Sequence, residues 1–155
     1  EQLAEEGEEQ GDTFAVIPRM MKKEDFAHWL LSAALRMNQA MNRERDNTMK
    51  QVIQKAKEYI MDNYQDPDLS VEKICRQLHM SPAYFSTMFK KETGQTLTQY
   101  LIDVRIDKAK EMLRNPERTI GEIACMVGYQ DERHFSKLFS KMTGVKPTEY
   151  RRFYV

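Results

Sequence analysis

The last two thirds of the sequence show apolar residues at helical spacing, divided by short polar breaks. Behind Thr119, a residue type that caps helices, apolar side chains recur every three or four positions as far as Val127. Gly128 follows, and glycine readily adopts the positive φ that a sharp turn needs. Asp131 then begins a second stretch, in which Phe135 and its apolar neighbours fall on one helical face. This pattern predicts a helix, a tight turn and a second helix.

The same order of residues occurs twice in the chain. A shift of 50 residues aligns Ser81 with Asp131, Phe85 with Phe135, Phe89 with Phe139, Thr93-Gly94 with Thr143-Gly144 and Tyr100 with Tyr150. Before the turn the shift is 49 residues, which aligns His79 with Gly128. Histidine is among the non-glycine residues found at positive φ, so we expect His79 to be a turn residue rather than a ligand or a proton sensor. Two copies are too few for a solenoid, and they predict two similar helix-turn-helix modules in one domain.

The segments around the modules supply the remaining helices. Asn47 is a suitable cap for a helix that the sequence Asp66-Pro67-Asp68 would end. Residues 97–113 are apolar over more than half of the helical circumference, so this helix must be covered on two sides and is expected to connect the modules. Pro147 begins a short last helix. The sequence therefore predicts an all-α fold of about seven helices, with modules at 47–95 and 115–155 joined by a long central helix at 96–114.

The first 46 residues differ in character from the rest. Residues 1–21 are acidic and interrupted by glycine, which predicts a flexible, solvated segment rather than an acidic mimic that covers a DNA-binding face. Residues 22–46 are predicted to form an amphipathic helix ahead of the domain. Its apolar stripe consists of Phe26, Leu30, Ala33, Met37 and Ala40, widened by Trp29 and Met41. Two interpretations stay open for this helix: it packs on the core of its own or an upstream domain, or it pairs two subunits as a coiled coil.

The formal charge of zero conceals an uneven distribution along the chain. Residues 1–46 carry six Lys or Arg against ten Asp or Glu, whereas residues 47–155 carry 18 against 14. The second part is therefore only mildly basic, and an argument for nucleic-acid binding must depend on where its charges lie.

Five short motifs in the second module form a specific combination. They are Ile120–Ala124 (IGEIA), Gly128-Tyr129, the pair Phe135 and Phe139, Thr143-Gly144, and Pro147–Arg151 (PTEYR). Together they resemble the DNA-binding domain of the AraC/XylS family of transcription regulators, and the match covers about residues 51–154.

The resemblance implies a sequence-specific double-stranded DNA-binding transcription regulator. The internal repeat adds the hypothesis that its two recognition helices enter successive major grooves on one face of the duplex. Members of that family are usually activators, so RNA polymerase is an expected partner and the cytoplasm the expected location. The chain begins with Glu1, and we expect it to be part of a longer regulator, free or anchored to a membrane, whose upstream sensor or receiver domain is missing here. A homodimer formed through residues 22–46 is a further expectation.

Base contacts require long polar side chains on the outward face of a recognition helix. In the second module Arg133 and Lys137 can pair with guanine O6 and N7, and Glu132 can accept from cytosine N4. Ser136 and His134 are secondary candidates on the same helix. In the first module the face that the resemblance assigns to DNA carries Ala83, Ser86 and Thr87. These short residues can contact a thymine methyl or one base edge, but they cannot make a bidentate contact to guanine.

Phosphate contacts supply affinity without sequence preference and are expected near the ends of the recognition helices. The candidates are Lys90, Lys91, Lys141, Lys146 and Thr98, together with the amide ends of helices that begin near Ser81, Thr98 and Asp131. The alternative for each lysine is an ordinary solvated helix face.

Other functional classes find less support in the sequence. No nucleophile elbow, phosphate loop or metal-binding motif is present, so we expect no enzyme, no metal and no cofactor. Cys75 and Cys125 lack ligand spacing and are expected to be reduced thiols. No apolar run approaches the ~18 residues of a membrane span. The remaining alternative is a protein-interaction module that keeps the fold and has lost its affinity for DNA.

Overall fold

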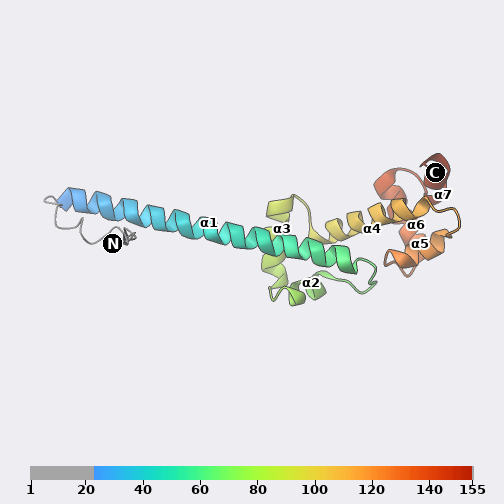
Figure 1. Ribbon diagram of the computed structural model, residues 1–155, viewed down its shortest axis with the longest axis horizontal. Helices are drawn as coiled ribbons and strands as arrows, with labels where there is room; N and C mark the ends of the chain where they lie inside the picture. Colours follow the sequence, from blue (N-terminus) through green and yellow to red (C-terminus); the bar gives the residue numbers. More distant parts are fainter. Residues whose placement is uncertain (1–22, 155) are drawn as a thin grey trace, which may run out of the picture. The chain divides into compact units, whose positions relative to one another are not determined.

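The computed structural model describes residues 23–154 of the chain, which form seven α-helices and no strand (Figure 1). The helices are α1 (Lys23–Asn63), α2 (Val71–Gln77), α3 (Pro82–Thr93), α4 (Leu97–Leu113), α5 (Ile120–Met126), α6 (Glu132–Thr143) and α7 (Pro147–Tyr154). The predicted all-α fold is confirmed. The acidic segment predicted at residues 1–21 lies outside the described residues.

Helix α1 corrects one expectation, because no new helix begins at Asn47. Instead, α1 continues from Lys23 to Asn63 through the polar stretch around Asn47. Neither glycine nor proline interrupts residues 43–50, and an asparagine caps a helix only where the preceding backbone is non-helical. By its contacts the chain divides into two units, residues 1–46 and 47–155, so that α1 contributes to both. The predicted domain limits themselves stay a prediction.

In the first unit, α1 carries its apolar side chains on the surface. Phe26 and Trp29 stack with their ring centroids 6.2 Å apart. Among the described side chains of this unit, from Asp25 to Asp46, none is buried. Leu30, Met37 and Met41 are all more than half exposed.

The second unit begins with the first helix-turn-helix module. Within α1, Ile53, Ala56 and Ile60 are buried against this module. The Ser70 hydroxyl caps α2 by accepting a hydrogen bond from the Lys73 backbone N–H. The turn that follows contains His79 at φ 55°, which confirms the predicted turn residue.

The second module repeats this arrangement with stronger caps. At the start of α5, the Thr119 hydroxyl accepts from the Glu122 N–H, and the Glu122 carboxylate accepts from the Thr119 N–H, which forms a capping box. Gly128 occupies the turn at φ 89°, and Asp131 caps α6. The predicted caps and the predicted glycine turn are therefore confirmed.

Helix α4 extends from the α2–α3 pair to the group formed by α5, α6 and α7 (Figure 1). The buried residues of this helix are Leu97, Leu101, Arg105, Ile106, Ala109 and Leu113. Tyr100 on α4 meets Phe89 edge-on at 5.7 Å, and Tyr150 on α7 meets Phe139 edge-on at 5.5 Å. The central helix thus carries one module at each end, as the sequence predicts.

Candidate nucleic-acid interface

Helix α6 presents a polar face opposite two fully buried rings. Phe135 and Phe139 have no exposed surface, and their ring centroids are 5.7 Å apart. Glu132, Arg133 and Lys137 are exposed on this helix, and Ser136 is half-buried. Burial of the aromatic pair therefore turns three charged side chains outward, as a recognition helix requires.

The N-terminus of α6 is held by Asp131. Its Oδ1 accepts hydrogen bonds from the backbone N–H of Arg133 at 2.7 Å and of His134 at 3.2 Å. The hydrogen bonds from His134 and then Arg133 favour the charged carboxylate, so they lower the pKa of Asp131. The first turn, which carries Glu132 and Arg133, is thereby fixed at its start.

The carboxylate of Glu132 lies against the adjacent helix α5. A Cβ atom placed on Gly121 would come within 2.7 Å of Glu132 Oε2. This glycine leaves the space that the carboxylate occupies. Glu132 is therefore exposed, and its carboxylate lies beside α5.

Helix α3 presents a shorter and mostly neutral face. Ala83 and Thr87 are exposed, and Ser86 is half-buried. The Thr87 hydroxyl donates to the Ala83 carbonyl oxygen at 3.0 Å, which leaves its oxygen free to accept. Ser81 is the N-cap of this helix, but its side chain accepts no cap hydrogen bond from any described residue, and Pro82 follows at the first helical position.

The predicted phosphate-binding residues all lie on the surface. Lys90, Lys91, Lys141, Lys146 and Thr98 are exposed. Thr98 lies one residue inside α4, whose cap is Thr96; the Thr96 hydroxyl accepts from the Gln99 N–H at 3.2 Å. Lys91 and Lys141 occupy equivalent places in the last turns of α3 and α6. Each module therefore carries a cation at the same end of its candidate recognition helix.

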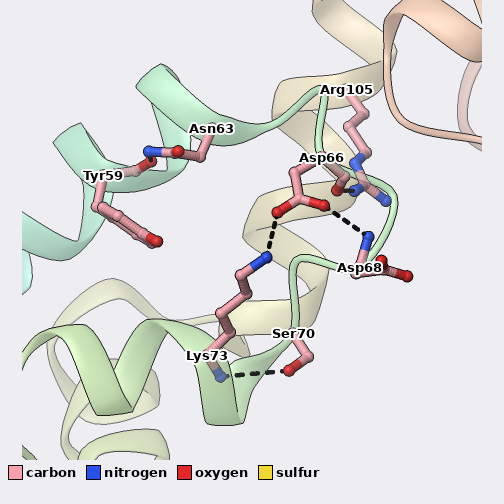
Figure 2. Close-up of polar contacts among 7 residues, drawn as sticks. All are labelled: Tyr59, Asn63, Asp66, Asp68, Ser70, Lys73 and Arg105. Carbon is pink, nitrogen blue, oxygen red and sulfur yellow. Dashed lines mark hydrogen bonds and ion pairs between the residues drawn. The ribbon is translucent and has the colours of Figure 1, made fainter.

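Sequence reasoning missed Arg105, a buried arginine in the middle of α4. Only 7% of its surface is exposed. Its Nε donates to the Tyr64 carbonyl oxygen at 2.9 Å. Its Nη2 donates to the Asp66 carbonyl oxygen at 2.8 Å (Figure 2). One signal could have identified it. Arg105 is the only charged member of a row of residues spaced four apart, Leu97, Leu101, Arg105, Ala109 and Leu113.

The remaining candidate chemistry is sparse. Cys75 is buried, and burial raises the pKa of its thiol, whereas Cys125 is exposed. Within residues 23–154, no group of three or more His, Cys, Asp or Glu side chains is arranged to hold a metal ion. In the same part of the chain, each helix is too short or too polar to cross a lipid bilayer.

Comparison with known proteins identifies relatives of this arrangement. The family model described as a helix-turn-helix domain matches residues 74–152, about half of the chain. The transcriptional activator RhaR of Pectobacterium carotovorum subsp. carotovorum (strain PC1) is 40% identical over 81 residues, which are 52% of this chain and 28% of RhaR. The chain therefore matches less than a third of that relative's length.

Two solved structures resemble the fold. The C-terminal domain of AraT, a response regulator from Geobacillus stearothermophilus, is 39% identical with a TM-score of 0.64, over 65% of this chain and 84% of that one. The DNA-binding domain of AdpA, solved in complex with a target DNA, has a TM-score of 0.62 over 66% of this chain and 91% of that one. At 22% identity, the AdpA comparison supports the fold alone.

Proposed function

The chain belongs to the AraC-type family of helix-turn-helix domains, and we propose that it is a sequence-specific DNA-binding transcription regulator. The observation that carries this proposal is the outward face of α6, where Arg133 and Lys137 are exposed above the buried pair Phe135 and Phe139. A helix with one exposed polar face and one buried apolar face can place the polar face in a major groove while its apolar face stays in the core.

Sequence recognition is assigned mainly to α6. The Arg133 guanidinium can make two hydrogen bonds to guanine, and Lys137, one turn later, can reach the same groove. Glu132 can accept from cytosine N4, and Ser136 is a secondary contact. Helix α3 enters the neighbouring major groove with Ala83, Ser86 and Thr87, whose short side chains favour shape and thymine methyl contacts over guanine recognition.

Affinity is assigned to the exposed cations around both helices. Lys90 and Lys91 lie in the last turn of α3, Lys141 lies in the last turn of α6, and Lys146 lies just before α7. Thr98 and the amide ends of the helices that begin near Ser81, Thr98 and Asp131 add contacts to phosphate oxygen atoms. Each phosphate that is neutralised releases counterions, so binding should weaken steeply as salt is raised.

Duplex selection followed by a salt titration tests this function. The 155-residue chain is used to enrich binding sites from random duplex DNA, and affinity is then measured at several salt concentrations. We expect one enriched sequence, bound more tightly than a scrambled duplex, and a linear fall of log K with log salt. Failure to bind any duplex at low salt would contradict the proposal and favour an interaction module without affinity for DNA.

The proposal extends to the partners through which this chain would regulate transcription. RhaR is named as a transcriptional activator and AraT as a response regulator. By analogy, this chain activates transcription with RNA polymerase as a partner, under the control of an upstream sensor or receiver domain.

Residues 22–46 are proposed to pair two subunits. The support is the apolar stripe of α1, since Leu30, Met37 and Met41 stay largely exposed in the single chain. A coiled coil would bury this stripe against a second copy. Leu30→Asp should then shift the chain from dimer to monomer in sedimentation equilibrium, and an unchanged mass would argue against pairing.

A further inference from the structure

The buried side chain of Arg105 lies where the two helix-turn-helix modules approach each other. We propose that Arg105 is the positioning residue that fixes one module relative to the other, and that simultaneous binding to two major grooves depends on it. This inference rests on the proposed function for its consequence, but its geometry can be tested without DNA.

On one side, Arg105 holds the loop that joins α1 to α2 in the first module. The two guanidinium bonds go to backbone carbonyls of Tyr64 and Asp66, which are separated from Arg105 by about 40 residues. The loop is itself braced, because the Asp66 carboxylate accepts from the Asp68 N–H at 2.9 Å and from the Lys73 ammonium group (Figure 2). Lys73 belongs to α2, so the connection continues into the first helix-turn-helix.

On the other side, Arg105 contacts the turn of the second module. Its guanidinium carbon lies 5.1 Å from the centroid of the Tyr129 ring, within the range of a cation–π contact. Tyr129 in turn touches two residues of α6, His134 at 5.7 Å and Phe135 at 5.6 Å between ring centroids. The same guanidinium group therefore reaches the start of the second recognition helix through one aromatic ring.

Gly128 shows that the backbones of the two modules meet at this place. A Cβ atom added to Gly128 would lie 2.6 Å from the Tyr64 carbonyl oxygen and 2.8 Å from Arg105 Nη2. Such distances are far below van der Waals contact. The turn of the second module is thus fitted directly against the loop of the first, with Arg105 closing the junction.

The chemistry of arginine suits a junction that must have one geometry. Apolar contacts along α4 are non-directional and tolerate small rotations, whereas hydrogen bonds weaken steeply away from their preferred angles. The planar guanidinium donates in a fixed fork, and its face stacks on an aromatic ring, a combination that lysine cannot reproduce. Burial of a charge is unfavourable without partners, which the two carbonyls and the ring supply.

The position of the two modules affects DNA affinity because binding of one module raises the effective concentration of the other near its half-site. When one module is bound, the second groove is within reach of the other module only if their relative position matches the spacing of the grooves. A loose junction leaves each module able to bind its own half-site but removes the gain from linkage. We expect Arg105 variants to lose roughly 10- to 100-fold in affinity for DNA with both half-sites and to keep their affinity for one half-site.

Distances between spin labels test the junction itself. Labels are attached at Lys91→Cys and Lys141→Cys, near the ends of α3 and α6, in a Cys125→Ser background that removes the exposed native thiol. Pulsed electron paramagnetic resonance should give one narrow distance in the parent and a distribution at least twice as wide in Arg105→Met and Arg105→Lys. The matched control is Arg114→Met, at the exposed end of the same helix, which should resemble the parent.

Binding assays with the unlabelled chain complete the test. Circular dichroism first establishes whether each variant is folded. If Arg105→Met does not fold, the test is made with Arg105→Lys alone. An unchanged narrow distance in the Arg105 variants, or full affinity for the two-half-site duplex, would overturn the proposal. Loss of fold in both variants would also overturn it, because Arg105 would then stabilise the modules rather than position them. If the parent binds no duplex, the proposed function fails, yet the distance measurement still decides the role of Arg105.

Discussion

Phe85 and Phe89 in α3 occupy the places that Phe135 and Phe139 occupy in α6, and all four rings are fully buried. The ring centroids within each pair are 5.8 and 5.7 Å apart, with interplanar angles of 50° and 53°. Both helices end at a glycine in the left-handed conformation. The interiors of the two modules are thus nearly interchangeable.

The outward faces of the same two helices differ. Where α6 exposes Arg133 and Lys137, the equivalent residues of α3 are Ala83 and Thr87. Close packing constrains a buried face to a narrow range of shapes, whereas an exposed residue can change at little cost in stability. The two modules should therefore be equal in their contribution to folding and unequal in their contribution to recognition.

The largest expected effect tests the equality of the interiors. Phe89→Ala and Phe139→Ala should each lower the free energy of unfolding by about 3–5 kcal/mol, because each leaves a cavity in a close-packed core. Urea denaturation, monitored by circular dichroism, measures the free energy of unfolding of both variants. A cost confined to one of the two variants would show that the modules are not equivalent in packing.

The turns provide the first contrast between the modules. Gly128→Ala should cost about 2–5 kcal/mol, since the added Cβ meets a positive φ and lies too close to the Tyr64 carbonyl oxygen and the Arg105 side chain. His79→Gly should change the free energy of unfolding by less than about 0.5 kcal/mol, because His79 is exposed and already has positive φ. Thermal unfolding of both variants checks this contrast, and similar costs would contradict it.

The recognition faces provide the second contrast. Arg133→Ala should weaken binding to the selected duplex by about 1–3 kcal/mol and relax the preference at one base pair. Ser86→Ala in α3 should weaken binding to the same duplex by a smaller amount. Lys141→Ala serves as a control for a phosphate contact, because it should weaken all sequences alike and reduce the salt slope by about one. Unchanged base preference in the Arg133 variant would remove that residue from direct readout.

The smallest effect concerns the helix caps and acid pH. The pKa of Asp131 is lowered in the folded chain, so its carboxylate stabilises the fold above the ordinary aspartate pKa, and this contribution is lost as pH falls through the folded pKa. The variant Asp131→Ser gives α6 a serine cap, which does not titrate and is the residue type that precedes α3. The urea midpoint of the native chain should therefore exceed that of the variant at pH 6, with the gap narrowing at pH 3. A gap that is independent of pH would contradict this assignment.

Most of the fold could be predicted because its determinants are local. The caps at Ser70, Thr119 and Asp131, the turns at His79 and Gly128 and the buried phenylalanines follow from residue type and spacing over one or two helical turns. The continuity of α1 through Asn47 could not be predicted, because a residue type that caps helices is also tolerated within one. Only the surrounding stretch, without glycine or proline, indicates that the helix continues.

The candidate site could be predicted less fully than the fold. The exposure of Arg133 and Lys137 follows from the position of the buried aromatic pair. The approach of Glu132 to Gly121 and the junction at Arg105 depend on contacts between helices, which helical periodicity does not encode. Positive φ gave one reason for glycine at position 128, and the close approach of Tyr64 adds a second that only the tertiary structure reveals.

Hydroxyl-radical footprinting on the selected duplex tests most directly whether both modules bind DNA. Two recognition helices in successive major grooves should protect two regions on one face of the duplex, about 34 Å apart along its axis. Protection by α3 should persist in Arg133→Ala while protection by α6 weakens. A footprint limited to one groove in the native chain would contradict binding by two modules.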